Sequence, residues 1–166
     1  MAFVSTTSTL GRVDKGLLAL MAGGTAATPG YFIADVPWTG FKTQTGSRAA
    51  DQSSAKLGGG QGYSDSGLVN NETTRDHYFD AGTFKCARIL PYDTNLGINS
   101  TQIDGVTVAS QDQYASPATN NNYVETTGIA VTAGLKVVKH ISLSKNASSS
   151  AYYLPMQSCA FVRTGA

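Results

Sequence analysis

Hydrophobic and polar residues alternate with a period of two in several stretches of this chain, which predicts a β-rich protein. The clearest alternation runs through residues 83–90. One face of that stretch is apolar apart from the head group of one arginine: Phe84, Cys86, the stem of Arg88 and Leu90. We expect Pro91 to end this strand, because proline cannot donate a hydrogen bond to the ladder.

The strongest hairpin signal lies just beyond that strand. Asp104-Gly105 separates Thr101-Gln102-Ile103 from Val106-Thr107-Val108. A two-residue Asp-Gly loop between β-branched runs is typical of a tight β-hairpin. The sequence therefore predicts two antiparallel strands joined at this turn.

Further strands are predicted by short runs rich in branched and aromatic residues. They cover 31–36, 123–127, 128–132, 135–143, 151–154 and 159–163, with Pro37 and Pro155 as breaks. In the 135–143 run, Leu135, Val137 and Ile141 give one mostly apolar face, while His140 lies on the more polar face.

One helix is predicted near the beginning of the chain. Leu10, Val13, Leu17 and Leu20 or Met21 recur at helical spacing, and Gly23-Gly24 supplies a stop. Residues 1–9 are small and hydroxylated, so we expect a flexible N-terminal arm that becomes ordered on contact.

The rest of the chain is predicted to be one domain over residues 10–166, with long polar loops at about 43–71 and 110–122. No fixed-period repeat is present, which excludes solenoids and propellers. The expected fold class is mainly β, a compact antiparallel β-barrel or sandwich-like domain with one short N-terminal helix and long polar loops.

Composition narrows the function classes. Charged residues make up only 14% of the chain, the net charge is +1, and the sequence has no basic patch. We therefore do not expect direct binding to nucleic acid. The apolar run at 17–22 is too short to span a bilayer, and the first residues lack a secretory pattern, so we expect a protein made in cytoplasm with no membrane partner. Cys86 and Cys159 are interpreted as buried small side chains, although pairing stays open.

No catalytic pattern emerges, and we expect a protein that is not an enzyme. His77 follows Asp76 and could be oriented as a base, but a structural role is favoured for it and for His140. Neither histidines nor cysteines have metal-ligand spacing, and the glycines at 58–62 lack the context of a phosphate loop. No metal or cofactor is predicted.

Tyr78-Phe79-Asp80-Ala81-Gly82-Thr83-Phe84-Lys85, closing at Leu90-Pro91, resembles the pattern of lambda-type head decoration proteins of tailed bacteriophages. The resemblance implies a β-rich, usually trimeric capsid cement protein on the capsid exterior of the virion. Its partners would be the major capsid protein and itself, and it would be made in the host cytoplasm. The 43–71 and 110–122 stretches have no counterpart in that family, so the oligomeric state and lattice position stay open.

On this interpretation each copy would lend an arm or edge strand to a neighbour. The expected partner-facing anchors are Phe3, Val4, Leu10, Tyr31, Phe32, Trp38 and Phe41. Core packing is the alternative role, above all for Phe32 and Leu10.

Two alternative functions remain. One is another phage structural protein, such as a tail tube, fibre or minor capsid subunit. The other is a carbohydrate-binding β-sandwich, in which Trp38, Tyr152 and Tyr153 would stack on sugar rings.

Overall fold

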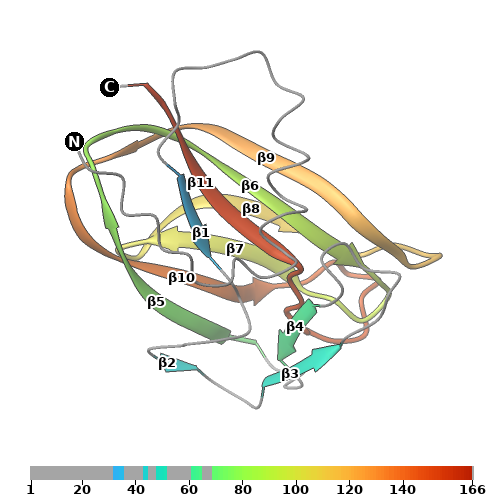
Figure 1. Ribbon diagram of the computed structural model, residues 1–166. Helices are drawn as coiled ribbons and strands as arrows, with labels where there is room; N and C mark the ends of the chain where they lie inside the picture. Colours follow the sequence, from blue (N-terminus) through green and yellow to red (C-terminus); the bar gives the residue numbers. More distant parts are fainter. Residues whose placement is uncertain (1–31, 36–42, 45–47, 52–60, 65–68, 166) are drawn as a thin grey trace.

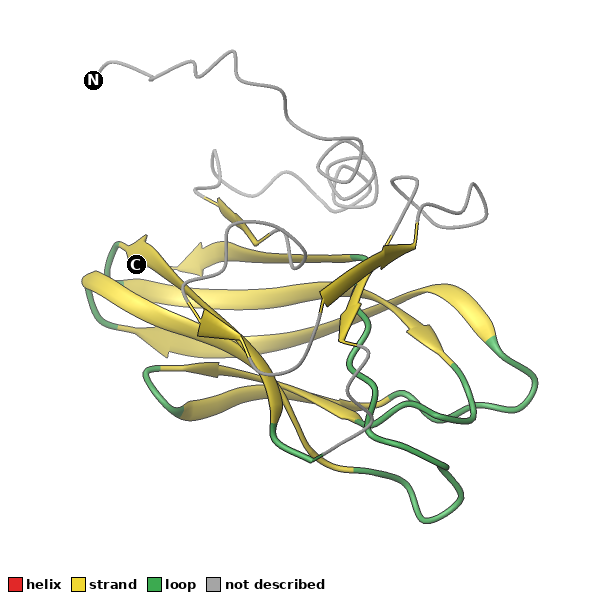
Figure 2. Cartoon of the chain, turned by 90° about the horizontal axis from the view of Figure 1, so that it is seen from below, coloured by secondary structure: helices red, strands yellow, loops and turns green. Residues whose placement is uncertain are grey.

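The computed structural model of the chain describes residues 32–35, 43–44, 48–51, 61–64 and 69–165. These residues form strands and loops and contain no helix. Two antiparallel sheets stack into a β-sandwich, which Figures 1 and 2 show from two directions. The predicted mainly β fold is confirmed, in its sandwich form. The predicted arm at 1–9 and the helix after it lie outside the described residues.

The first sheet has four strands in the order β1-β11-β6-β9, so strands from both ends of the described chain lie side by side (Figure 1). Its members are β1 (Phe32–Asp35), β6 (Gly82–Tyr92), β9 (Thr119–Val131) and β11 (Ser158–Gly165). β1 confirms the strand predicted at 31–36, and its backbone pairs with β11 from Phe32↔Val162 to Asp35↔Cys159.

The second sheet has five strands in the order β2-β5-β10-β7-β8. Its members are β2 (Thr43–Gln44), β5 (Asn71–Phe79), β7 (Ile98–Ile103), β8 (Val106–Asp112) and β10 (Gly134–Ser144). Within this sheet the longest pairing joins β10 to β5, from Gly134↔Phe79 to Ser142↔Asn71.

The two predicted loops contain more strand than expected. Within 43–71 lie β2 and a separate antiparallel pair, β3 (Arg48–Asp51) and β4 (Gln61–Ser64). In the 110–122 stretch, β8 continues to Asp112 and β9 begins at Thr119, which leaves a loop of residues 113–118. Low apolar content did not prevent pairing, because backbone hydrogen bonds do not require branched side chains.

The core lies between the two sheets. Phe79 of β5 contacts Phe84 and Phe161 edge-to-face, with ring centroids 5.3 and 5.4 Å apart. Cys86 and Cys159 are buried beside them with their Sγ atoms 3.9 Å apart, far longer than an S–S bond. Both are therefore buried thiols, as the interpretation of the sequence favoured.

The strand at 83–90 does not end where the sequence predicted. β6 includes Pro91 and continues to Tyr92. Its register with β9 shifts between Leu90 and Tyr92, opposite Asn121, which has a φ of 62°. Proline is accommodated because this irregularity removes the need for an N–H donor at that position.

The hairpin prediction is confirmed. β7 and β8 meet at Asp104-Gly105, whose φ values of 48° and 83° are those of a turn with both central residues left-handed. Asp104 also accepts a hydrogen bond at Oδ1 from the backbone N–H of Val137 (2.9 Å), and its own N–H donates to the Val137 carbonyl (2.9 Å). The turn is thereby tied to β10.

Three other strand predictions need correction. The stretches 123–127 and 128–132 form one strand, β9, with a register shift at Gly128, whose φ is 75°. Residues 151–154 form no strand beyond one bridge, Leu96↔Tyr153, because their backbone groups pair with the loop before β7. In β10 the more polar face is the buried one, whereas Leu135 is 67% exposed.

Candidate functional site

Among the predicted partner-facing anchors, Phe32 lies in the described part of the chain. Phe32 begins β1, where its backbone pairs with Val162. The other predicted anchors lie outside the described residues: Phe3, Val4, Leu10, Tyr31, Trp38 and Phe41. Their role stays a prediction.

The two histidines occupy strands of the second sheet. Asp76 and His77 are consecutive in β5, so their side chains point to opposite faces of the sheet. His140 is buried, with Nδ1 3.1 Å from the Thr101 hydroxyl. The structural role favoured by the sequence fits His140, and for His77 it stays a prediction.

Three loops gather at one end of the sandwich. We call the surface that they form, together with the neighbouring ends of β6 and β8, the loop platform. It consists of residues 92–97, 112–118 and 145–157. Its members come from three separate connections, β6–β7, β8–β9 and β10–β11.

Backbone hydrogen bonds join the first of these loops to the second. The Asp93 N–H donates to the Gln113 carbonyl (3.0 Å), and the Ala115 N–H donates to the Asp93 carbonyl (3.3 Å). The buried Gln113 side chain adds Nε2 bonds to the carbonyls of Pro91 (2.8 Å) and Pro155 (3.1 Å). One glutamine therefore links the end of β6 to the loop before β11.

The first loop is also joined to the third. The Ser150 N–H donates to the Thr94 carbonyl (2.9 Å), and the Gly97 N–H donates to the Tyr153 carbonyl (2.9 Å). The buried Ser149 hydroxyl donates to the Leu96 carbonyl (2.7 Å). Such a network holds loops in one arrangement, as a binding surface requires.

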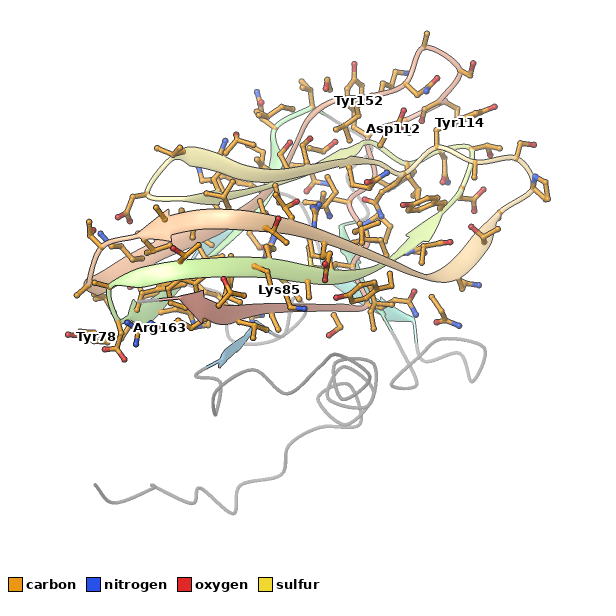
Figure 3. The ribbon with its side chains drawn as sticks, turned by 90° about the horizontal axis from the view of Figure 1, so that it is seen from above. Tyr78, Lys85, Asp112, Tyr114, Tyr152 and Arg163 are labelled. Atoms are coloured by element: carbon orange, nitrogen blue, oxygen red, sulfur yellow. The ribbon has the colours of Figure 1, made fainter. Side chains whose placement is uncertain are left out.

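Asp112 connects the second loop to the third. Its Oδ1 accepts from the Tyr114 N–H (2.9 Å), and its Oδ2 accepts from Asn146 Nδ2 (2.7 Å). Both carboxylate oxygens are therefore engaged, while the half-buried side chain stays beside the surface. Figure 3 places Asp112, Tyr114 and Tyr152 at the same end of the molecule, away from Tyr78 and Arg163.

Tyrosines are concentrated on the platform. Four of the eight in the chain, all half-buried, belong to it: Tyr92, Tyr114, Tyr152 and Tyr153. Lys145 Nζ lies 5.2 Å from the Tyr152 ring centroid and donates to the Ser149 carbonyl (2.6 Å). Burial raises the pKa of Tyr92, the positive charge of Arg88 opposes that rise, and the negative charge of Asp112 adds to it.

The platform combines aromatic and polar side chains. Half-buried phenol rings offer flat apolar surface with a polar edge, and Asp112, Asn146 and Lys145 supply acceptors and donors beside them. No group of three metal-ligating side chains occurs in the ranges that the structure describes. The same part of the chain contains no apolar helix of membrane-spanning length.

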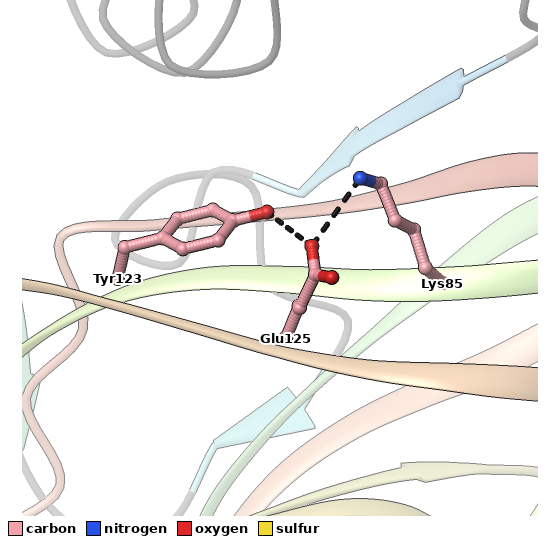
Figure 4. Close-up of polar contacts among 3 residues, drawn as sticks. All are labelled: Lys85, Tyr123 and Glu125. Atoms are coloured by element: carbon pink, nitrogen blue, oxygen red, sulfur yellow. Dashed lines mark hydrogen bonds and ion pairs between the residues drawn. The ribbon is translucent and has the colours of Figure 1, made fainter. Parts of the chain in front are cut away.

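A second polar cluster lies on the four-stranded sheet, where Tyr123 and Glu125 of β9 meet Lys85 of β6 (Figure 4). The Tyr123 hydroxyl donates to Glu125 Oε2 (2.6 Å), and Lys85 Nζ lies 3.3 Å from the same oxygen. Burial, followed by the hydrogen bond to Glu125, raises the pKa of Tyr123 to about 12. Hydrogen bonds from Tyr123 and then Lys85 lower the pKa of the Glu125 carboxyl.

Comparison with known proteins finds similarity of fold alone. No protein-family model matches the sequence, and no curated protein matches it either. Among solved structures, a xanthan lyase of Paenibacillus is similar with a TM-score of 0.64 and 20% identity, over 75% of this chain and 12% of the lyase. The likeness to the lyase therefore concerns a small part of that protein.

Two similar structures are separate carbohydrate-binding modules. A family 35 carbohydrate-binding module from an environmental isolate has a TM-score of 0.52 and 12% identity, over 79% of this chain and 91% of the module. The CBM36-1 domain of a multidomain xylanase from the hindgut metagenome of Trinervitermes trinervoides has a TM-score of 0.50 and 14% identity. The match covers 80% of this chain and 95% of that domain. The β-sandwich of this chain is thus of the kind found in such modules.

Sequence reasoning identified only part of the platform. Tyr152 and Tyr153 were candidates for sugar stacking, whereas Tyr114, Asp112 and Asn146 were not. Asp112 lay in a stretch interpreted as a polar loop, and its proximity to Asn146 depends on a contact 34 residues apart. The one local signal was the clustering of tyrosines after Pro91, before Pro117 and before Pro155.

Proposed function

We propose that this protein is a carbohydrate-binding β-sandwich and that the loop platform is its binding surface. The observation that carries the proposal is the set of half-buried tyrosines on loops that are hydrogen-bonded to one another. The similar fold of two carbohydrate-binding modules supports it.

The proposed mechanism is recognition without reaction. A sugar ring would stack on the exposed face of Tyr114 or Tyr152, burying apolar C–H groups against the aromatic surface. Its hydroxyl groups would exchange hydrogen bonds with Asp112, Asn146 and the serines of the third loop. Because the platform is already joined by hydrogen bonds, little ordering entropy would be lost on binding.

The test is a binding screen with the purified chain, by affinity electrophoresis and calorimetry on soluble polysaccharides. Xanthan and xylan belong in the panel because similar structures come from a xanthan lyase and a xylanase. For the best ligand, Tyr152→Ala and Tyr114→Ala should each weaken binding by about tenfold or more, a loss of about 1.4 kcal/mol.

Tyr78 provides the matched control. Its side chain is 61% exposed and lies at the opposite end of the molecule (Figure 3), so Tyr78→Ala should leave the affinity unchanged. Equal losses in all three variants, or no ligand in a broad glycan panel, would contradict the proposal.

Capsid decoration remains a second proposal, supported by the resemblance at 78–91. In the structure, Phe79 and Phe84 of that stretch pack in the core, and Asp80 and Ala81 form the exposed turn between β5 and β6. Sedimentation of the protein with mature phage heads tests it. Co-sedimentation that persists in the Tyr152→Ala variant would favour this function over glycan binding.

A further inference from the structure

Arg88 is the most unusual side chain of the interior. It extends from β6 of the first sheet toward β7 of the second and is only 1% exposed. Its Nη1 donates to the Asn99 carbonyl (3.3 Å) and to Asn99 Oδ1 (3.2 Å). A fixed positive charge thus lies inside the sandwich with a neutral residue as its hydrogen-bond partner.

Within the part of the chain that the structure describes, no carboxylate forms an ion pair with Arg88. Ion pairs join Lys85 to Glu125, Lys136 to Asp104 and Lys139 to Glu72, and none of these three includes Arg88. The charge of Asp112 raises the pKa of the nearby Tyr92. The Asp112 carboxylate accepts its hydrogen bonds from Tyr114 and Asn146.

Two buried donors in this contact lack an acceptor among the described residues. They are Arg88 Nε and the Nδ2 amide of Asn99, the same residue that accepts from Nη1. Nε belongs to the edge of the guanidinium that binds anions side-on. Because Arg88 donates to Asn99 through Nη1, these hydrogen bonds do not involve this edge. Both unused groups are N–H donors, so their common requirement is an acceptor.

The charge cannot be removed by deprotonation, because arginine stays protonated in proteins. A buried charge is costly unless it is paired as well as hydrogen-bonded. A neutral water molecule would accept a hydrogen bond but would leave the charge uncompensated. A monovalent anion would accept the hydrogen bond and also compensate the charge. A multivalent anion would lose far more hydration energy on entering a site that is closed to solvent.

We propose that Arg88 and Asn99 form an internal binding site for a small monovalent anion of the halide class, held on the Nε edge of Arg88 between the two sheets. Binding of the ion to the folded chain alone would couple its concentration to stability.

A first experiment measures thermal unfolding of the full chain at constant ionic strength while sodium chloride replaces sodium gluconate, whose anion is too large for a closed site. The Tm should rise by about 3–6 °C for each tenfold increase in chloride above its Kd. In Arg88→Met, which keeps the length of the side chain but not the charge, the Tm should not respond to chloride.

Arg163→Met is the matched control. Arg163 is half-buried and donates to the carbonyls of Ala81 (2.6 Å) and Gly165 (3.1 Å), so its loss should leave the chloride response intact. A chloride response that persists in Arg88→Met, or that disappears in Arg163→Met, overturns the site.

A second experiment does not depend on any variant folding. Crystals of the unmodified chain grown in sodium bromide should give an anomalous peak within hydrogen-bond distance of Arg88 Nε. A map without that peak overturns the proposal, whatever the Tm does.

Discussion

The phenol of Tyr123 donates to Oε2 of Glu125 across 2.6 Å, and the shared oxygen also faces Lys85 (Figure 4). The hydrogen bond from Tyr123 is the larger cause of the lowered pKa of Glu125, and the one from Lys85 is second. We therefore expect Tyr123→Phe to raise the pKa of Glu125 toward its ordinary value of 4.5 by more than Lys85→Met does. Carboxyl-carbon NMR titrations measure both shifts.

The same contact sets the sign of a small effect on stability. A lowered folded-state pKa adds stability above the unfolded value, and that stability is lost as the pH falls through the folded value. The difference between the unmodified chain and Tyr123→Phe should thus shrink on acidification from pH 7. It should not exceed about 1 kcal/mol, since the Glu125 side chain is exposed to solvent. If the pKa of Glu125 shifts more in Lys85→Met than in Tyr123→Phe, the order of the two contributions to that pKa is wrong.

The β7–β8 turn offers a second pH-dependent prediction. The backbone hydrogen bond from Val137, and next the bond from Lys136, lower the pKa of Asp104 below 3.8. Asp104→Asn removes the charge but tolerates the left-handed φ of 48°. We expect a lower Tm for this variant at pH 7 and a Tm equal to that of the unmodified chain once the pH falls below the folded pKa. Unfolding curves at several pH values check this, and a Tm difference that grows on acidification would refute it.

Gly97 faces a steric limit that Gly128 does not. A Cβ at Gly97 would overlap Ser142 Oγ and lie 3.2 Å from Ser142 Cβ, whereas a Cβ at Gly128 meets open space but a φ of 75°. Gly97→Ala should cost about 1–3 kcal/mol by overpacking, and Gly128→Ala about 1 kcal/mol by backbone strain. Adding Ser142→Ala should recover part of the first loss and none of the second, as measured in urea unfolding. Equal recovery at both positions would rule out the steric explanation.

How far the sequence predicts this molecule depends on the range of the interactions involved. The Asp104-Gly105 hairpin was predicted because two adjacent residues determine the turn. The core strand β6 was predicted because its alternation agrees with its burial at Phe84 and Cys86. Both signals are local, and neither needs knowledge of the partner strand.

The buried face of β10 could not be predicted in that way. Leu135 is exposed while His140 is buried, because the register with β5 and β7 turns the more polar face toward the interior. There His140 meets the Thr101 hydroxyl, and Arg88 reaches Asn99 from the opposite sheet. A polar interior of this kind is stabilised by contacts between distant residues, which alternation along one strand does not contain.

The loop platform was missed in part for the same reason, and Gln113 illustrates it. Its 0% exposed side chain donates to the carbonyls of Pro91 and Pro155, residues 22 and 42 positions away in the chain. Nothing in the local sequence marks this glutamine as different from Gln111 or Gln102. Its role becomes visible only when three loops meet.

Gln113→Glu is therefore expected to be far more damaging than its chemistry suggests. The new carboxylate would face two carbonyl oxygens in a buried position, at a cost of about 3 kcal/mol or more. Burial would raise its pKa, so the loss in stability should grow as the pH rises through the unfolded-state value near 4.3 and should be smaller in acid. Thermal unfolding at pH 4 and pH 7 measures this trend.

Gln102→Glu is the matched control for that variant, because the side-chain hydrogen bond from Gln102 to Thr107 is exposed and the position should tolerate the charge at both pH values. If the platform binds glycans, Gln113→Glu should also weaken binding at temperatures where the chain is still folded. The variant loses the hydrogen bonds to Pro91 and Pro155, so the loops that carry Tyr114 and Tyr152 would separate there. Unchanged stability and unchanged affinity in Gln113→Glu would show that the loops are held together without this residue, and the argument for a preorganised surface would fail with it.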